Sequence, residues 1–368
     1  MDLQKAFDTV NHDILLYKLH CYGVRGINHE WFRSYLYNRK QYTYQAGCSS
    51  TLSNIDCGVP QGSVLGPLLF LIYINDICNA VPDDDIFLFA DDSNLFIRGK
   101  SKIEVMERAN LGLSNLNEWF LANKLSLSLD KTCYTVFPAN KRDGIYISLG
   151  QTDLKHVHSC KYLGITIDAD LKWIDHVNSV YKKLIKYVGI FYKLRKILPI
   201  YCLKSLYFAF VHSNLLYGVE IYGNACSKHL DKLVKLNNKI LRILQNVNIR
   251  THVTDLYTHY CTLPIPILHE LQLASIVHKF YRHPDILPDI FRNYFTRNTL
   301  IHNHNTRQHT DLHINRVHSS KGQKSFKYKG CSIWNGLPDS LKESRSVRGF
   351  RYGLKMYLLG KFVQRKQN

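Results

Sequence analysis

An apolar run that ends in two adjacent carboxylates decides how this sequence is interpreted: Ile86-Phe87-Leu88-Phe89-Ala90-Asp91-Asp92. The run has the length of a β-strand, and three consecutive aspartates at 83–85 bound its other end. We therefore predict a strand over residues 86–90 that ends at Asp91. Two aspartates after an apolar run usually form a solvated turn, so this run alone does not indicate catalysis.

Two earlier segments carry residue types suited to nucleotide chemistry. The first is Asp2-Leu3-Gln4-Lys5-Ala6-Phe7-Asp8, and the second is Gly58-Val59-Pro60-Gln61-Gly62-Ser63-Val64-Leu65-Gly66-Pro67. Glycines let a backbone approach a ligand closely, and glutamine both donates and accepts hydrogen bonds. Nucleotidyl transfer with two divalent cations requires two or three aspartates at strand ends. Asp2, Asp91 and Asp92 are the candidates for that role.

The rest of the first half alternates irregularly between helix and strand patterns. Apolar residues keep helical spacing over 103–123, whereas residues 131–137 and 162–167 have strand patterns. This irregular alternation favours an α+β fold over a doubly wound sheet.

After Asp168 the pattern becomes helical and basic. Apolar positions predict one amphipathic helix over 177–194 and a second over 230–244, and the prolines in 263–266 predict a break. From Asn303 onward the composition is rich in His, Asn and Lys, and only the segment Trp334-Asn335-Gly336-Leu337-Pro338 is expected to be ordered.

The chain of 368 residues has a formal net charge of +19, which is typical of proteins with a polyanionic partner. The charge is uneven, because residues 1–100 hold 8 Lys/Arg and 11 Asp/Glu whereas residues 301–368 hold 14 and 3. Ten cysteines form no C-x-x-C pair, so neither a zinc ribbon nor a disulfide framework is indicated. Without a signal peptide or a transmembrane run, we expect an intracellular protein of the nucleus and/or cytoplasm, not secreted and not in a membrane.

In this order, the motifs resemble those of reverse transcriptases. Asp2 with Phe7 looks like motif A, residues 58–67 look like motif B, and Phe89-Ala90-Asp91-Asp92 looks like motif C. Residues 123–132, from Asn123 to Thr132, look like motif D, and Tyr162-Leu163-Gly164-Ile165 is similar to the primer-grip motif E.

Finer details resemble jockey-type, LINE-like non-LTR retrotransposons rather than retroviruses. These details are the alanine in Phe-Ala-Asp-Asp, the long motif B and the run Lys5-Ala6-Phe7-Asp8. Asn305-Thr306-Arg307, residues 326–330 and residues 334–338 are similar to the C-terminal regions of the same elements. The resemblance implies an RNA-directed DNA polymerase whose partners are a template RNA, a DNA primer and deoxynucleoside triphosphates, with the oligomeric state left open.

The resemblance also implies a role for each site residue. Two Mg²⁺ ions, with Mn²⁺ as an alternative, would bind Asp2, Asp91, Asp92 and the Leu3 carbonyl. The expected nucleotide contacts are Leu3, Phe7 as a steric gate against the ribose 2′-hydroxyl, Gln61 and Gly62. Lys131 is the candidate general acid. The primer grip comprises Tyr162, Leu163 and Gly164.

The implied fold is a reverse transcriptase palm, an antiparallel sheet with packed helices, over residues 1–168. A helical thumb or connection over 169–262 and a basic C-terminal region over 263–368 would follow. The family's fingers precede motif A, whereas here Asp2 follows Met1 directly. From this we expect an incomplete fragment with weak or no activity alone.

Three other interpretations remain open. One is a catalytically inactive remnant that binds nucleic acid through its basic C-terminal region. Another is a group II intron maturase, although the segment around Trp334 does not resemble that class. The third is a structural helical protein, which would leave five ordered motifs unexplained.

Overall fold

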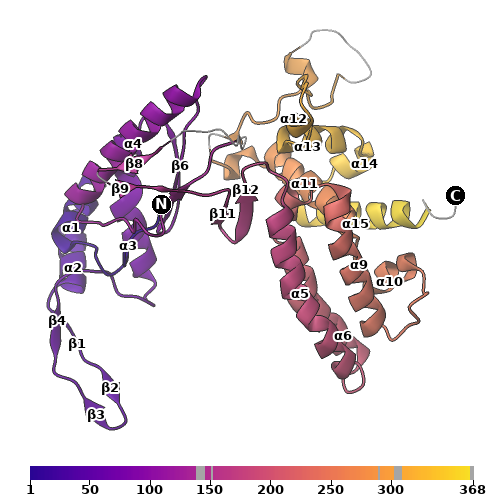
Figure 1. Cartoon of the computed structure of the whole chain (residues 1–368), viewed down its shortest axis with the longest axis horizontal. Helices are drawn as coiled ribbons and strands as arrows, with labels where there is room; N and C mark the ends of the chain where they lie inside the picture. Colours follow the sequence, from indigo (N-terminus) through magenta and orange to yellow (C-terminus); the bar gives the residue numbers. More distant parts are fainter. Residues whose placement is uncertain (138–145, 151, 289–290, 302–308, 365–368) are drawn as a thin grey trace. The chain divides into compact units, whose positions relative to one another are not determined.

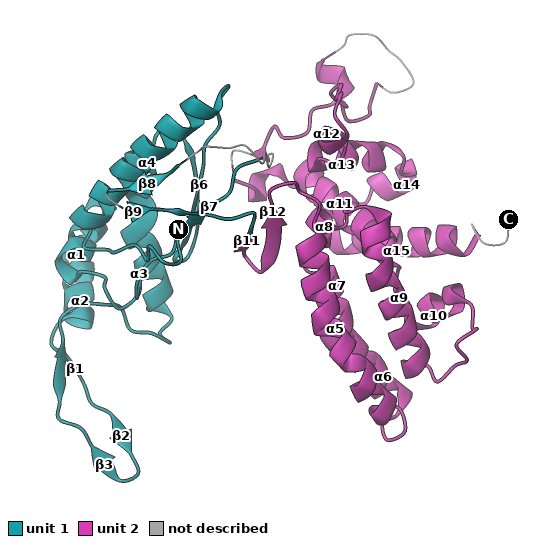
Figure 2. Ribbon diagram, viewed as in Figure 1, with its two compact units in different colours: residues 1–160 teal, residues 161–368 magenta. Residues whose placement is uncertain are grey.

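The computed structural model describes residues 1–137, 146–150, 152–288, 291–301 and 309–364. The chain divides into two compact units, residues 1–160 and residues 161–368, which Figure 2 draws in different colours. Helices and strands are both present, so the expected mixed fold is confirmed. The three-part division of the chain at residues 168 and 262 stays a prediction.

Unit 1, residues 1–160, combines long helices with short strands (Figure 1). Its helices are α1 (His12–Cys21), α2 (Ile27–Leu36), α3 (Leu65–Ile74), the 3₁₀ helix η1 (Asn75–Ala80) and α4 (Lys102–Ala122). Its longest strands are β5 (Asp85–Phe89) and β6 (Asp92–Phe96), which form an antiparallel hairpin. The shorter strands are β1 (Arg39–Gln41), β2 (Tyr44–Gln45), β3 (Cys48–Ser49), β4 (Ser53–Ile55), β7 (Cys133–Tyr134), β8 (Ser148–Leu149), β9 (Thr152–Asp153) and β10 (Lys155–His156).

The core of unit 1 lies between its helices and one face of the β5–β6 hairpin. Buried residues of α1, α3 and α4 include Leu15, Phe70 and Phe120, and Ile86 and Leu95 of the hairpin pack against them. Because side chains alternate along a strand, the other face of the hairpin points away from this core. That face carries Phe87, Phe89 and Phe96, which are exposed by 46%, 61% and 44%.

Two predictions for unit 1 are confirmed and one is only partly right. The strand before Asp91 is β5, and the helix over 103–123 is α4, which begins at Lys102 after the cap residue Ser101. The strand pattern over 131–137 forms only β7, which pairs in parallel with β10. The β-branched and aromatic composition of residues 131–137 therefore predicted the presence of this strand correctly, but the strand is shorter than predicted.

The pattern over 162–167 was interpreted as one strand, and this is wrong. The structure has two paired strands, β11 (Ser159–Tyr162) and β12 (Ile165–Asp168), joined by a two-residue turn. Both turn residues have positive φ, 45° at Leu163 and 80° at Gly164. This is the backbone of a type I′ hairpin turn, and the sequence signal for it was the single glycine.

Unit 2, residues 161–368, is mostly helical. The predicted basic helices are present as α5 (Ile174–Leu194) and α9 (Ser227–Leu244), which pack along each other. Between and after them the chain forms α6 (Ile200–Leu206), the π-helix η2 (Tyr207–His212), α7 (Ser213–Leu216), α8 (Val219–Tyr222), α10 (Val253–Tyr260) and α11 (Ile265–Arg282). The predicted break at 263–266 is confirmed, since α11 begins there with Pro266 in its first turn.

The C-terminal region is more ordered than its composition indicates. It forms α12 (Ser320–Gln323), α13 (Phe326–Asn335), α14 (Asp339–Lys342) and α15 (Val347–Gln364). Trp334, expected to be ordered, is 4% exposed and packs with Phe350 of α15. The Asn335 amide accepts a hydrogen bond from the Leu312 backbone nitrogen and donates one to the Leu312 carbonyl. The motif at 305–307 lies outside the described residues.

Within the ranges that the structure describes, no helix is both long enough and apolar enough to cross a membrane.

Candidate active site

Four strand-like segments of unit 1 lie side by side around Asp2. The Met1 amino group donates to the carbonyl of Ser93 in β6 at 2.8 Å, and the Ser93 backbone nitrogen donates to the Met1 carbonyl at 3.3 Å. On the other side, Ser128 donates to the Asp2 carbonyl at 2.8 Å, and Leu3 bridges Leu127 in antiparallel fashion. Residues 1–4 therefore extend the β5–β6 hairpin and connect it to the segment 126–128.

The register of these bonds places two of the predicted aspartates opposite each other. A pair of residues that exchanges both backbone hydrogen bonds is an antiparallel pair, so Met1 opposite Ser93 puts Asp2 opposite Asp92. Opposite residues in an antiparallel ladder point to the same face, and Asp92 also pairs with the exposed Phe89. Asp2 and Asp92 therefore belong to the face of the sheet that turns away from the core.

Asp91 lies in the two-residue turn of the hairpin, next to this pair. The residue before it, Ala90, has a φ of 52°, a conformation that non-glycine residues rarely adopt. Asp91 is partly exposed and Asp92 is exposed. Among the described residues, no group of three or more His, Cys, Asp and Glu side chains is gathered as a metal site. Carboxylate oxygens are the hard donors that Mg²⁺ prefers, and a metal role for Asp2, Asp91 and Asp92 stays a prediction.

Lys131 contacts the first aspartate directly. Its Nζ lies 3.1 Å from a carboxylate oxygen of Asp2, and the Lys131 side chain is 71% exposed. The Asp2 backbone nitrogen also donates to the Thr132 hydroxyl at 3.5 Å. The structure thus brings together Asp2 and Lys131, which lie far apart in the sequence and were both predicted site residues.

Residues 57–62 pack against residues 7–10. Val59 donates to the Phe7 carbonyl at 2.8 Å, and Gly58 donates to the Val10 carbonyl at 2.7 Å. The Gln61 side chain donates to the Asp8 carboxylate at 2.8 Å. The ring of Phe7, which is only partly buried, lies 4.6 Å from that of Phe70. The segments that carry Phe7 and Gln61 are therefore in contact, and Asp8 is a partner of Gln61 that the sequence did not single out.

Gly58 could not be any other residue without movement of this loop. Its φ is +89°, and a Cβ there would lie 2.8 Å from the Asp8 carbonyl oxygen. Gly62 has a similar φ of +82°, but a Cβ there would meet no atom within 4 Å. Gly58 thus allows the close approach of the two backbones, whereas Gly62 leaves open space beside Gln61.

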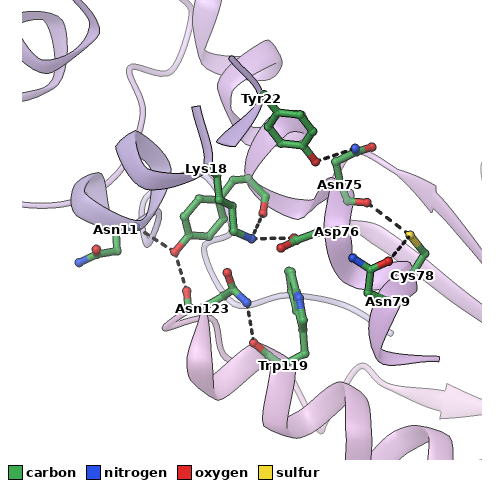
Figure 3. A network of polar contacts seen from close by, with 10 residues as sticks. Asn11, Lys18, Tyr22, Asn75, Asp76, Cys78, Asn79, Trp119 and Asn123 are labelled. Carbon is green, nitrogen blue, oxygen red and sulfur yellow. Dashed lines mark hydrogen bonds and ion pairs between the residues drawn. The ribbon is translucent and has the colours of Figure 1, made fainter. Parts of the chain in front are cut away.

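A buried lysine in the interior of unit 1 was not identified from the sequence. Lys18 of α1 is 8% exposed, and its ammonium donates to the Tyr73 carbonyl at 2.6 Å and to Asp76 at 2.7 Å. Figure 3 shows this network, in which Trp119 of α4 also lies beside the Lys18 ammonium. Burial lowers the pKa of Lys18, and the Asp76 carboxylate opposes that shift. The sequence contained one sign that Lys18 is buried, because it lies three residues after Leu15 on a helix face that is otherwise apolar.

Tyr73 connects this network to the segments that flank the site. Its hydroxyl donates to the Asn123 carbonyl at 2.6 Å and accepts from the Asn11 backbone nitrogen at 3.4 Å. Burial raises the pKa of Tyr73 to about 12. Since Asn11 caps α1 and Asn123 caps α4, Tyr73 fixes the start of one helix relative to the end of another.

The predicted primer-grip residues lie in unit 2, at the β11–β12 turn. The Tyr217 hydroxyl donates to the Leu163 carbonyl, and a Cβ at Gly164 would lie 3.2 Å from the Tyr217 ring. Tyr162, Leu163 and Tyr217 line an open, mainly apolar cavity of about 510 Å³. The turn is thus held by Tyr217, whose role the sequence did not indicate.

Comparison with known proteins identifies the domain that these residues form. Residues 1–167 match the family described as reverse transcriptase (RNA-dependent DNA polymerase). This part of the chain is thus similar to a reverse transcriptase domain. The predicted resemblance to reverse transcriptases is confirmed for these residues.

Proteins similar to most of this chain include RNA-directed DNA polymerases of mobile elements. It is 26% identical over 299 residues to the RNA-directed DNA polymerase from mobile element jockey of Drosophila funebris, and this match covers 78% of the chain and 32% of the relative. It is 25% identical over 297 residues to the probable RNA-directed DNA polymerase from transposon X-element of Drosophila melanogaster, covering 77% and 31%. The chain thus spans about a third of the length of these relatives.

Proposed function

We propose that this chain is the RNA-directed DNA polymerase of a non-LTR retrotransposon and extends a DNA primer on an RNA template. The observation that carries the proposal is the register that sets Asp2 opposite Asp92 beside the Asp91 turn, within a reverse transcriptase domain. Neighbouring carboxylates at strand ends are what two-metal nucleotidyl transfer requires.

In this proposal, the carboxylates of Asp2, Asp91 and Asp92 and the Leu3 carbonyl would hold two Mg²⁺ ions. The backbone hydrogen bonds around Leu3 support its carbonyl as a metal ligand. The backbone groups of residues 2 and 4 bond the 126–128 segment, and those of residue 1 bond β6. In an alternating ladder, the Leu3 carbonyl is then directed toward the β6 side, where Asp91 lies. Bound ions would supply positive charge to the primer hydroxyl and the triphosphate.

The remaining site residues would position the nucleotide and move a proton. Lys131, 3.1 Å from Asp2, would hold a proton near the triphosphate and pass it to the leaving pyrophosphate. Phe7 would exclude a ribose 2′-hydroxyl by its bulk. Gln61 and Gly62 would lie against the nucleotide and the template, with Asp8 orienting the Gln61 amide.

We further propose that unit 1 is the palm and that α5 and α9 of unit 2 belong to the thumb. Lys182, Lys186 and Lys193 of α5 are exposed, while Val177, Leu184 and Phe191 on its opposite side are buried. Such a basic face fits the phosphates of a template–primer hybrid. Tyr162, Leu163 and Gly164 would hold the primer at the β11–β12 turn.

Primer extension on an RNA template with Mg²⁺ tests the proposal. Asp2→Ala, Asp91→Ala and Asp92→Ala should each reduce extension by about 100-fold or more, because a clamp on the developing charge is lost. Asp83→Ala is the matched control, since Asp83 is an exposed aspartate at the other end of the hairpin. Equal extension by Asp91→Ala and the control would refute the assignment. A chain that binds template–primer without extending it would instead be a catalytically inactive nucleic-acid-binding remnant.

A further inference from the structure

A two-stranded ribbon formed by residues 39–55 projects from unit 1 beyond the end of α2 (Figure 1). At its base, β1 pairs with β4 from Arg39 opposite Ile55 to Gln41 opposite Ser53. At its tip, Tyr44 is opposite Ser49, so the three residues 50–52 face only the two residues 42–43. This extra residue is a β-bulge, which twists a ribbon. Ala46 and Gly47 form the end turn with φ of 49° and 87°, as a type I′ turn requires.

This 39–55 ribbon is exposed on both faces. Among its strand residues only Arg39 and Ile55, at the base, are partly buried, and every other one is exposed. A two-stranded ribbon without a packed third layer is marginally stable in water. An extended ribbon of this kind is therefore best explained by a partner that contacts it.

The chemistry of the ribbon differs from that of the sequence around it. Residues 31–55 contain Arg33, Arg39 and Lys40 and no Asp or Glu, although residues 1–100 as a whole hold more acidic than basic residues. The side chains of Tyr42 and Tyr44 are 60% and 68% exposed. Most other positions are Gln, Ser, Thr or Asn, which both donate and accept hydrogen bonds.

A stacked aromatic pair, of which Trp31 is exposed and Tyr35 is partly buried, lies just before the ribbon, on α2. The rings of Trp31 and Tyr35 stack with centroids 5.5 Å apart and an interplanar angle of 10°. Trp31 is 52% exposed, so much of this side chain is open to solvent. Aromatic rings that are held in place and solvent-exposed are platforms on which unpaired bases stack.

We propose that the 39–55 ribbon, together with Trp31, is a binding site for single-stranded RNA that is separate from the aspartate site. Tyr42, Tyr44 and Trp31 stack on unpaired bases, Arg39 and Lys40 contact phosphates, and the polar side chains of the ribbon bond base edges. This site goes beyond the polymerase function and does not rest on it, since binding requires neither metal nor catalysis.

The same features disfavour a second copy of the chain as the occupant. Two ribbons that paired edge to edge would bring Arg39 and Lys40 of each copy together, and these like charges would repel each other. The β-bulge also opposes such pairing, because it twists the edge of the ribbon. A polyanion is attracted by the same charges. The acid-free composition therefore favours RNA over self-association.

The test is binding of the full chain to a fluorescein-labelled 20-nucleotide oligouridine, measured by anisotropy at several salt concentrations. The double variant Tyr42→Ala/Tyr44→Ala should raise Kd about 10- to 100-fold, because two stacking platforms are lost. Arg39→Ser/Lys40→Ser should flatten the slope of log K against log salt by about 1.4, the value for two phosphate contacts on a single strand.

Tyr17→Ala/Tyr146→Ala is the matched control, since both tyrosines belong to unit 1 and are 71% exposed. This control should leave Kd unchanged within about twofold. A 4-thiouridine version of the oligonucleotide, crosslinked by light, should attach to residues within 31–55. Light scattering of each variant, without RNA, reports whether the ribbon joins copies of the chain.

Crosslinks within 31–55 together with weaker binding by the ribbon variant would support the proposal. Crosslinks elsewhere, with the same Kd for the ribbon variant and the control, would overturn it. A ribbon variant that changes the assembly mass but not Kd would also overturn it and assign the ribbon to protein contact. Primer extension is scored separately, so a chain that does not polymerise would remove the polymerase proposal and leave this one intact.

Discussion

Gly58 and Gly62 differ in the space beside their Cα atoms, and this difference predicts how much stability each loses when alanine replaces it. Both have positive φ, so alanine at either position adds backbone strain of about 1 kcal/mol. Only at Gly58 would the new methyl group also collide with the Asp8 backbone. Gly58→Ala should therefore lower the free energy of unfolding by about 3 kcal/mol and Gly62→Ala by about 1 kcal/mol. Urea unfolding measures both, and equal losses would show that the close approach to Asp8 is not stabilising.

At this scale the sequence named candidate residues but not how they meet. Asp2, Phe7, Gln61 and Lys131 were named because their motifs resemble those of reverse transcriptases, and their roles in a site stay predictions. Their neighbours followed from register and close packing, which a single sequence does not encode locally. The contact between Gln61 and Asp8 is an example, since 53 residues separate them in the chain.

At the scale of elements, Tyr73 links helices that surround the site. Tyr73→Phe removes only the hydroxyl, which leaves the Asn123 carbonyl without this donor and the Asn11 nitrogen without this acceptor. The free energy of unfolding should fall by about 1–3 kcal/mol, the range for a buried polar group that loses its partner. Thermal or urea unfolding of the variant gives the value.

Tyr37→Phe is the control for this deletion, because its hydroxyl bonds Asp13 at an exposed position. Its loss should change stability by less than about 0.5 kcal/mol. If both variants were equally stable, Tyr73 would not connect α1 and α4 energetically.

Elements with a regular apolar period were predictable, and those shaped by long-range packing were not. The predicted helix over 103–123 is α4 because its apolar positions repeat along one face. The helix α15 was missed because Gly349, Gly353 and Gly360 interrupt its pattern, and each glycine costs a helix about 1 kcal/mol. Burial of Phe350 and Leu354 against α11 and α13 offsets that cost, and this packing depends on residues far away in the sequence.

At the scale of the whole molecule, buried histidines should make unit 2 sensitive to acid. His269 of α11 is 2% exposed, and burial, with the Lys329 ammonium nearby, lowers its pKa to about 3. The Lys329 Nζ lies 3.4 Å from the His269 Nδ1. Above pH 6.5 this histidine is neutral in both the folded and the unfolded chain. Below pH 6.5 the unfolded chain binds the proton and the folded chain does not, so stability is lost as the pH falls toward 3.

The size of this effect follows from the shift. For a pKa of 6.5 in the unfolded chain and about 3 in the folded one, His269 alone should lower the free energy of unfolding by about 2 kcal/mol between pH 8 and pH 5. His269→Gln should remove that dependence while His158→Gln, at an exposed position, should keep it. Urea unfolding followed by circular dichroism at pH 8, 6.5 and 5 separates the slope with pH from any constant loss caused by the substitution. The same slope in His269→Gln and in the unsubstituted chain would mean that other groups, such as His212 with its pKa lowered to about 4, cause the acid sensitivity.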